Sequence, residues 1–91
     1  MRNAHEVAVI VVTYNRKQDL VQCVQALLDQ TVECDIIIVD NASTDGTQGY
    51  LAKHIFVDKQ RIHYLCLEDN LGGSGGFHHG LNYALDRKSV V

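Results

Sequence analysis

Three polar or glycine-rich segments of the 91-residue chain carry the side chains and backbone freedom that binding a small polar molecule requires. The first holds Thr13, Tyr14 and Asn15, whose hydroxyl, flat ring and amide can contact a nucleotide base. The same residues can instead terminate a strand and, through Asn15, cap a helix. Their spacing leaves both interpretations open.

The second segment begins at Asp40, whose carboxylate can accept a hydrogen bond from a base N–H or a ribose hydroxyl, as an acidic residue does in dinucleotide sites. A turn-forming role is the alternative for Asp40. Ser43, Thr44 and Asp45 follow it. These residue types favour shaping the turn and capping the next helix over contacting a ligand.

The third segment contains Gly72, Gly73, Gly75 and Gly76, with Ser74 between them, ahead of an expected helix. Backbone N–H groups there can approach an anion closely, because no side chain intervenes. Neither a P-loop lysine nor a Rossmann fingerprint after the first strand is present, which removes most of the support for an NAD-dependent function. The alternative is structural, since small residues also let a helix pack tightly on a sheet.

Three apolar runs, at 7–12, 36–39 and 62–67, predict the strands that deliver these segments. The first two are typical of strands covered on both faces. Between them, helically spaced apolar residues predict an amphipathic helix of about four turns. Those residues are Leu20, Cys23, Val24, Leu27 and Leu28. Asn15 followed by Gln18 resembles a capping box and places the helix start.

A shorter helix, capped by Thr47 and reaching Ile55, is expected after the second strand, and another from near Ser74 to about Asp86 after the third. The predicted apolar face of the last helix consists of Phe77, Gly80, Leu81, Ala84 and Leu85. This β-α-β-α-β-α order predicts one α/β domain with a parallel sheet and right-handed crossovers. Ligands of such sheets bind beyond the carboxyl ends of the strands, where all three polar segments fall.

The composition excludes several classes of function. An apolar content of 46% and a charged content of 21% are typical of one globular domain. A net charge of −3 with scattered basic residues argues against nucleic acid as a partner. No apolar run approaches the roughly 20 residues of a membrane span, and the first residues lack the organisation of a signal peptide. A cytoplasmic protein is therefore expected.

Cysteine and histidine patterns do not predict a metal site. Cys23, Cys34 and Cys66 are odd in number and widely spaced, which predicts buried free thiols. His78 and His79 are adjacent and would point about 100° apart on a helix, so they suit one metal ion poorly. At least one of these histidines is expected on the surface.

Taken together, the chain from Val7 to Leu85 resembles glycosyltransferase family 2, the inverting nucleotide-sugar transferases with the GT-A fold. The resemblance rests on three signatures in the right order and spacing, at residues 9–16, 37–47 and 70–77, followed by Gly80. The third signature is most similar to members that transfer galactofuranose or rhamnose onto bacterial surface polysaccharides.

The resemblance implies that Thr13 and Tyr14 line a base pocket, that Asp40 lies near the uracil and ribose, and that the glycines lie along the nucleotide sugar. Many members carry Asp-Asp where this chain has Asp40 and Asn41, so either position remains a candidate for base contact. An amide suits that role because it offers both a donor and an acceptor. The implied substrate-binding residues are Thr13, Tyr14, Asn15, Asp40, Asn41, Gly72, Gly73, Gly75 and Gly76.

The family's metal-binding Asp-x-Asp and its catalytic carboxylate lie further along the chain. No Asp-x-Asp occurs here, and the nearest imitation, Glu33-Cys34-Asp35, precedes the second strand. Residues 1–91 are therefore expected to be the N-terminal part of a family 2 domain, truncated before the Asp-x-Asp strand and inactive alone. Mg²⁺ or Mn²⁺ is expected only in the full-length enzyme, and no catalytic or metal-binding residue is expected in this chain.

The implied reaction transfers a sugar from a UDP- or dTDP-linked donor to a hydroxyl of a saccharide or lipid-linked acceptor. Its expected setting is cell-surface polysaccharide synthesis, in the cytoplasm or at the inner face of the membrane. A non-catalytic nucleotide-binding module is the main alternative, because Asp-x-Asp is missing. A flavodoxin-like interaction domain is a third, which the glycine-rich segment disfavours. In the GT-A strand order, truncation would leave residues 7–12 as an unprotected edge, so self-association is also expected.

Overall fold

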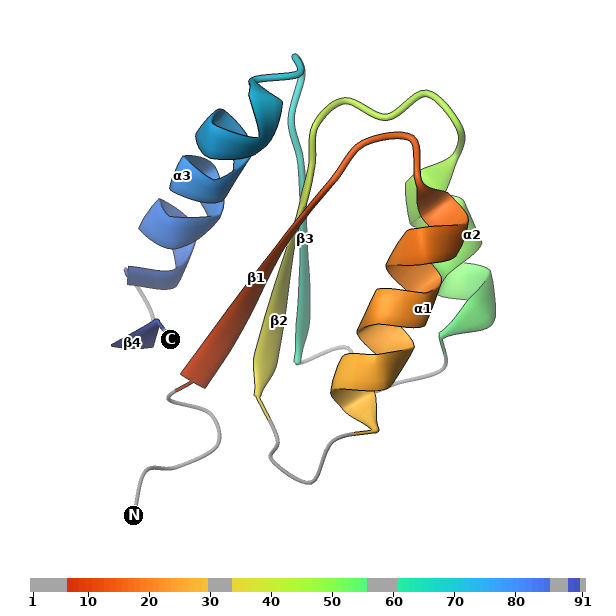
Figure 1. The fold of residues 1–91 in the computed structure, drawn as a ribbon, viewed down its shortest axis with the longest axis horizontal. Helices are drawn as coiled ribbons and strands as arrows, with labels where there is room; N and C mark the ends of the chain where they lie inside the picture. Colours follow the sequence, from red (N-terminus) through yellow and green to blue (C-terminus); the bar gives the residue numbers. More distant parts are fainter. Residues whose placement is uncertain (1–6, 30–33, 56–60, 86–88, 91) are drawn as a thin grey trace.

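The computed structural model describes residues 7–29, 34–55, 61–85 and 89–90, which form a sheet with helices on both faces (Figure 1). In chain order the elements are β1 (Val7–Thr13), α1 (Lys17–Leu28), β2 (Asp35–Asp40), α2 (Thr47–His54), β3 (Ile62–Cys66), α3 (Gly72–Leu85) and β4 (Ser89–Val90). Helices α1 and α2 cover one face of the sheet, and α3 covers the other.

The strands are parallel and lie in the order β3-β2-β1-β4. Thr13 pairs with Asp40, which pairs in turn with Cys66, so the three long strands end in one row. This arrangement confirms the predicted α/β fold of three β-α units. It also brings the three polar segments to the same edge of the sheet, as parallel strands require.

Strand β2 is buried along its whole length. Side chains on a strand alternate between the two faces. Ile36 and Ile38 accordingly join the apolar cluster beneath α1 and α2, whereas Ile37 and Val39 join the cluster beneath α3. Complete burial of each such side chain contributes about 1.5–3 kcal/mol. The continuous apolar run at 36–39 is thus a strand covered on both faces, as predicted.

Helix α3 packs on the sheet through its smallest residues, Gly76, Gly80 and Ala84. A Cβ atom at Gly80 would lie 2.6 Å from Ile10 Cγ2 and 3.0 Å from a Val39 methyl carbon, so only glycine allows this approach. The predicted apolar face was wrong at two positions. Phe77 and Leu85 are 42% and 61% exposed, because the small residues of α3 take the positions that face the sheet.

The predicted capping box at the start of α1 was wrong. Arg16 is the N-cap residue, and no side chain caps the helix. Asn15 adopts a left-handed backbone conformation with φ of 49°, and its Oδ1 accepts a hydrogen bond from the Thr44 backbone N–H instead. The Asn15 side chain, which local spacing assigned to the start of α1, therefore bonds Thr44, which is 29 residues away in the sequence.

The N-terminal ends of the other two helices also differ from the prediction. Gly46, with φ of 76°, takes the N-cap position of α2, and Thr47 is the first helical residue, whose hydroxyl donates to the Asp45 carboxylate. Helix α3 begins at Gly72, two residues before Ser74. All four glycines of the segment therefore lie within the helix, not ahead of it. The predicted end near residue 86 falls outside the described residues.

Strand β4 was not predicted. It pairs Ser89 with Val7 and Val90 with Ala8, so the expectation of an unpaired edge over all of 7–12 was wrong at its first two residues. From Val9 to Thr13, no strand among the described residues pairs with β1 on the side away from β2. The edge is therefore shorter than expected and lies nearest the carboxyl end of the strand.

All three cysteines are free thiols, as predicted, but the predicted burial was correct for only one of them. Cys34 is buried, whereas Cys23 and Cys66 are exposed. Cys23 lies on α1 at the margin of its apolar face, and Cys66 is the last residue of β3. Neither position is covered by another element. In the described part of the chain, no helix has the length and apolar character needed to cross a membrane.

Candidate functional site

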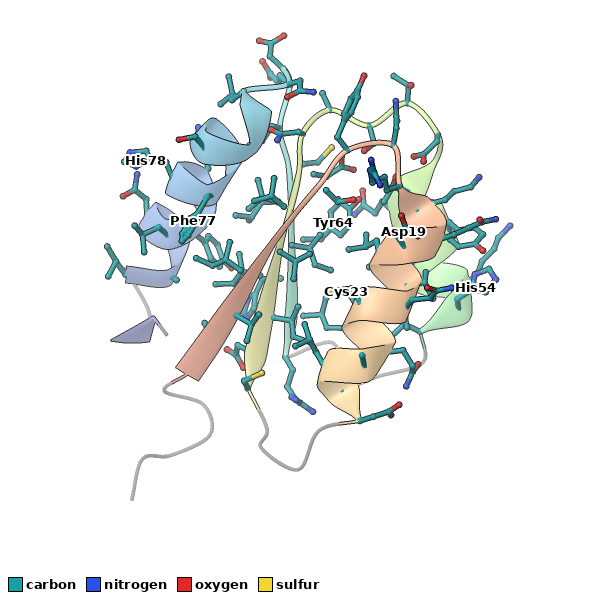
Figure 2. All side chains as sticks on the ribbon, viewed as in Figure 1. Asp19, Cys23, His54, Tyr64, Phe77 and His78 are labelled. Atoms are coloured by element: carbon teal, nitrogen blue, oxygen red, sulfur yellow. The ribbon has the colours of Figure 1, made fainter. Side chains whose placement is uncertain are left out.

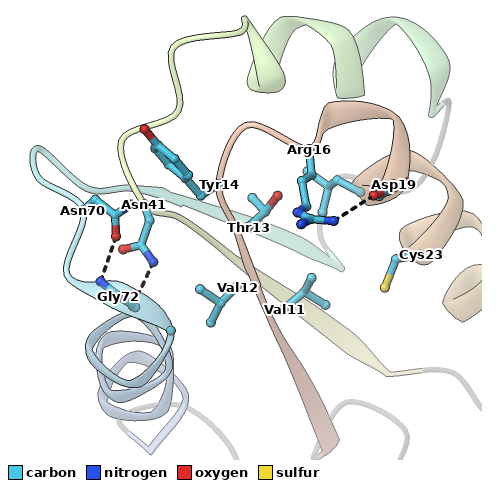
Figure 3. Close-up of a pocket in the computed structure, with 12 residues that line it drawn as sticks. Val11, Val12, Thr13, Tyr14, Arg16, Asp19, Cys23, Asn41, Asn70 and Gly72 are labelled. Atoms are coloured by element: carbon cyan, nitrogen blue, oxygen red, sulfur yellow. Dashed lines mark hydrogen bonds and ion pairs between the residues drawn. The ribbon is translucent and has the colours of Figure 1, made fainter.

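A cleft of about 480 Å³ lies along the unpaired part of β1, between α1 and the start of α3 (Figure 3). Its volume is within the range of sites that bind small molecules. The residues that line it are Val11, Val12, Thr13, Tyr14, Arg16, Asp19, Leu20, Cys23, Asn41, Asn70, Gly72 and Gly73. The cleft thus lies at the carboxyl edge of the sheet, where the strand order predicts a ligand.

The cleft brings together five of the nine residues that the sequence indicated, from all three segments. They are Thr13, Tyr14, Asn41, Gly72 and Gly73. The other four, Asn15, Asp40, Gly75 and Gly76, do not line it. Each of those four instead contacts a neighbouring part of the fold.

Asn41 joins the turn after β2 to the start of α3. Its side chain is buried; Nδ2 donates to the Gly72 carbonyl oxygen at 2.9 Å, and Oδ1 accepts from the Leu71 N–H at 3.3 Å. A Cβ atom at Gly76 would lie 2.9 Å from Nδ2 and 2.8 Å from a Val12 methyl carbon, so glycine there makes room for Asn41. Gly75 similarly faces Leu71 closely.

Asp40 is 3% exposed, and its carboxylate is held from two sides. Oδ1 accepts from the Ser43 N–H at 2.9 Å, and Oδ2 accepts from the Tyr64 hydroxyl at 2.6 Å. Its backbone carbonyl also accepts from the N–H groups of Ala42 and Leu67. The geometry therefore shows a turn-forming role for Asp40. Direct contact between Asp40 and a base stays a prediction.

Asn15 binds the turn after β2 through its backbone N–H and its side-chain Oδ1. Its backbone N–H donates to Ser43 Oγ at 2.9 Å, and its Oδ1 accepts from the Thr44 N–H at 2.7 Å. Within that turn, Ala42 has φ of 64°, a left-handed conformation that is costly for alanine and needs support from its surroundings. Ser43 and Thr44 shape the turn, as their residue types predicted.

Among the described residues that line the cleft, only Arg16 and Asp19 carry a charge. Arg16 Nη1 lies 3.5 Å from Asp19 Oδ2, and the two side chains are 75% and 68% exposed (Figure 3). An exposed pair of this kind contributes little to stability. The Arg16 guanidinium can therefore reorient towards an anionic ligand at low cost.

Asp45, in the turn after β2, and Tyr64, which contacts Asp40, have shifted pKa values. A hydrogen bond from the Thr47 hydroxyl lowers the pKa of Asp45. Burial, followed by the hydrogen bond to Asp40 and the charge of that residue, raises the pKa of Tyr64 well above its ordinary value. The Tyr64 hydroxyl therefore stays a neutral donor, and the turn carries a negative charge at Asp45.

Residues 8–90 match the model of glycosyl transferase family 2. The chain belongs to this family. It is 37% identical over 82 residues to a Bacillus subtilis glycosyltransferase named for teichuronic acid biosynthesis, covering 89% of this chain and 32% of that protein. It is 36% identical over 84 residues to an undecaprenyl-phosphate mannosyltransferase of Micrococcus luteus, covering 88% and 34% respectively.

An uncharacterized glycosyltransferase of Haemophilus influenzae is 34% identical over 82 residues, which are 89% of this chain and 25% of that protein. This family 2 chain therefore spans between a quarter and about a third of the length of these relatives. No solved structure gives a significant match.

The residues around the cleft of this family 2 chain do not fit a divalent metal ion. Asp19 is the only carboxylate among the described lining residues, and it is paired with Arg16. No group of three or more His, Cys, Asp or Glu side chains in the described ranges is placed to hold a metal. Mg²⁺ and Mn²⁺ favour several oxygen ligands, so any such site needs residues that this set does not include.

Seven lining residues were not indicated by the sequence: Val11, Val12, Arg16, Asp19, Leu20, Cys23 and Asn70. Arg16 and Asn70 lie within the first and third signature segments, so their position in those motifs was an available signal. Asp19 and Cys23 lie on α1, and only the rotation of that helix over β1 brings them to the cleft.

Proposed function

We propose that the intact protein is an inverting glycosyltransferase and that residues 1–91 form part of its donor-nucleotide site. The donor would be a UDP- or dTDP-linked sugar, and the acceptor a hydroxyl group. The observation that carries this proposal is the cleft at the carboxyl edge of the sheet, where the three signature segments of a family 2 chain meet.

The groups lining the cleft suit a pyrimidine nucleotide. Tyr14 is 45% exposed, so its ring can pack against the flat face of a base. Asn41 is buried with its amide bonded to Leu71 and Gly72, so it would hold the start of α3 in place beside the donor. Arg16 supplies the positive charge that a diphosphate requires. These contacts would orient the donor and take no part in proton transfer.

In the proposed reaction the acceptor oxygen forms a bond to the anomeric carbon of the sugar, and the bond from that carbon to the nucleoside diphosphate breaks. The hydroxyl proton passes to a carboxylate base. We place that base, and the Asp-x-Asp ligands for Mg²⁺ or Mn²⁺, beyond Val91. Continuing the β4 register, in which Ser89 pairs with Val7 and Val90 with Ala8, would put position 95 opposite Thr13 at the cleft.

The relatives named for teichuronic acid biosynthesis and for undecaprenyl-phosphate mannosyl transfer support a role in cell-surface polysaccharide synthesis with a saccharide or lipid-linked acceptor. Galactofuranose or rhamnose as the donor sugar rests on the third signature alone. A cytoplasmic location, at or near the inner face of the membrane, also stays a prediction.

NMR titration of the chain with UDP and dTDP tests the donor site. We expect weak binding, with shifts centred on Thr13, Tyr14, Asn41 and Gly73, and weaker binding for Asp40→Ala because the turn carrying Asn41 would lose its shape. Gly49→Ala, on the exposed side of α2, is the control. Shifts clustered at Asp35, at the opposite edge of the sheet, would show that the site is misplaced.

The chain is also expected to show no sugar transfer and no tight Mg²⁺ or Mn²⁺ binding by itself. Turnover by the purified 91-residue chain would contradict the assignment of the catalytic groups to later residues. A longer protein that binds UDP without ever transferring sugar would instead support the alternative of a nucleotide-binding module.

A further inference from the structure

Tyr64 lies on β3, and its ring packs against the apolar cluster beneath α1 and α2 (Figure 2). It does not line the cleft. Its hydroxyl nevertheless donates to Asp40 Oδ2 at 2.6 Å, within the range of strong hydrogen bonds to a charged acceptor. A ring in the core thus carries a polar group that reaches the last residue of the neighbouring strand.

The Asp40 carboxylate, held by Tyr64, also bonds the turn that follows. Its second carboxylate oxygen accepts from the Ser43 N–H, which closes the turn around Ala42 in its left-handed conformation. The other side of the turn is held by Asn15. With Asp40 fixed on one side and Asn15 on the other, the backbone between them has little freedom.

Asn41 is the next residue after Asp40, and adjacent residues of an extended chain point to opposite faces. The Asp40 side chain meets Tyr64 on the side of α1 and α2, whereas the Asn41 side chain meets Leu71 and Gly72 at the start of α3. The orientation of Asn41 in the cleft therefore depends on how the backbone at Asp40 is held.

We infer that Tyr64 is a positioning residue for the proposed donor site, because its hydroxyl holds the Asp40 carboxylate and thereby fixes the turn that presents Asn41 to the cleft. This inference rests on the proposed function. Tyr64 contributes no contact to the donor, and its role is to keep Asn41 in the orientation that bonds it to Leu71 and Gly72 at the wall of the cleft.

Tyr64→Phe tests this inference, since it keeps the ring in the core and removes only the hydroxyl. Tyr83→Phe is the matched control. Its hydroxyl lies 2.9 Å from His63 Nδ1, and His63 pairs with Asp35 at the opposite end of the sheet. Both variants lose the hydroxyl of a half-buried tyrosine that is hydrogen-bonded to another side chain, so both report the general cost of that loss.

The first measurement is by NMR in the absence of ligand. In Tyr64→Phe we expect shifted Asn41 side-chain amide signals and faster hydrogen exchange at the Ser43 and Leu71 backbone amides, with the amides of Ile37 and Ile38 unchanged. Tyr83→Phe should leave the Asn41, Ser43 and Leu71 signals as in the wild type. Unchanged signals in Tyr64→Phe, or equal changes in both variants, would overturn the inference.

The second measurement is the Kd for UDP. Loss of one hydrogen bond that orders a binding residue is worth on the order of a factor of ten, so we expect about tenfold weaker binding in Tyr64→Phe and an unchanged Kd in Tyr83→Phe. An unchanged Kd in Tyr64→Phe would show a purely structural role and overturn the inference. If the wild type binds neither UDP nor dTDP, the proposed function fails, while the NMR signals still judge the link from Tyr64 to Asn41.

Asp40→Asn keeps the inference testable if Tyr64→Phe does not fold. The amide has the shape of the carboxylate but lacks its charge, which weakens the bond from Tyr64. The changes at Asn41 and Leu71 should then appear with smaller amplitude. Their absence in a folded Asp40→Asn protein would contradict the proposed link.

Discussion

The Nδ2 atom of Asn41 lies 2.9 Å from the carbonyl oxygen of Gly72, and this hydrogen bond joins two segments that are 31 residues apart in the chain. The contact sets the distance between the turn after β2 and the first turn of α3, and both line the same cleft. One wall of the cleft therefore depends on a buried amide as well as on apolar packing.

Asn41→Ala should destabilise the chain by about 1–3 kcal/mol, because it removes a buried amide that bonds both the Gly72 carbonyl and the Leu71 N–H. Urea unfolding followed by circular dichroism measures this change. Asn82→Ala, at an exposed position on α3, removes an amide that does not bridge two segments and should stay within about 0.5 kcal/mol of the wild type. Equal effects of the two substitutions would contradict a bridging role for Asn41.

Gly80→Ala should destabilise the chain by about 1–3 kcal/mol, although alanine favours helices over glycine. The added methyl would meet Ile10 Cγ2 at 2.6 Å, so α3 must move away from the sheet. Gly49→Ala is the matched control in α2, where nothing lies within 4 Å of the added atom, and it should stabilise by up to about 1 kcal/mol. Thermal unfolding compares the two, and a stabilising Gly80→Ala would show that α3 packs less closely than described.

Stability should fall in alkali because of Tyr64. Burial raises its pKa, with the hydrogen bond and charge of Asp40 adding to the effect, so the folded state keeps a proton that the unfolded chain releases near pH 10.0. The stabilising contribution is then complete below pH 10.0 and is lost as the pH rises through the folded-state pKa. Urea unfolding above pH 10.0 should show that the free energy of unfolding falls more steeply in the wild type than in Tyr64→Phe.

Asp40→Asn provides an intermediate case for the same experiment. It removes the charge and weakens the bond, but the burial that is the main cause of the shift remains. Part of the alkaline loss should therefore persist in Asp40→Asn. Parallel curves for the wild type and Tyr64→Phe would exclude Tyr64 as the source.

We expect the 91-residue chain to self-associate through the unpaired edge of β1. In the described part of the chain, that edge consists of residues 9–13, because β4 pairs with Val7 and Ala8. The edge residues include no proline, lysine or inward charge, the usual protections against strand pairing. Light scattering should show dimers or larger species at high concentration, and Val11→Lys should shift the chain towards the monomer. A monomeric wild type with slow exchange at the Val9 and Val11 amides would show that the edge is covered in another way.

Much of the fold could be predicted because its strands are buried on both faces. The interior positions of a strand such as β2 must be apolar on both faces, and 36–39 has that pattern without reference to any other residue. Once the strands alternate with helices, the direction of a parallel sheet brings Thr13, Asp40 and the residues after Cys66 to one edge. The location of the candidate site followed from this rule alone.

The roles of individual residues within the site depended on contacts between distant parts of the chain. Sequence spacing assigned Asn15 to a helix cap, whereas Thr44, in the neighbouring turn, supplies its partner. The choice between Asp40 and Asn41 as the residue facing the cleft could not be made from their types, because both can bond a base. In the structure, Asp40 bonds Tyr64 on one face of the sheet, and Asn41 bonds Gly72 on the other.

The glycine-rich segment shows the same division. Its glycines allow the backbone to approach a neighbouring group closely, and that property is intrinsic to residues without a side chain. Whether the neighbour was a ligand or the sheet depended on the rotation of α3, which places Gly76 and Gly80 against β1 and β2 and leaves Gly72 and Gly73 at the cleft. Local sequence determines which conformations and contacts are possible, and packing between remote segments selects among them, because only the folded chain brings those segments within contact distance.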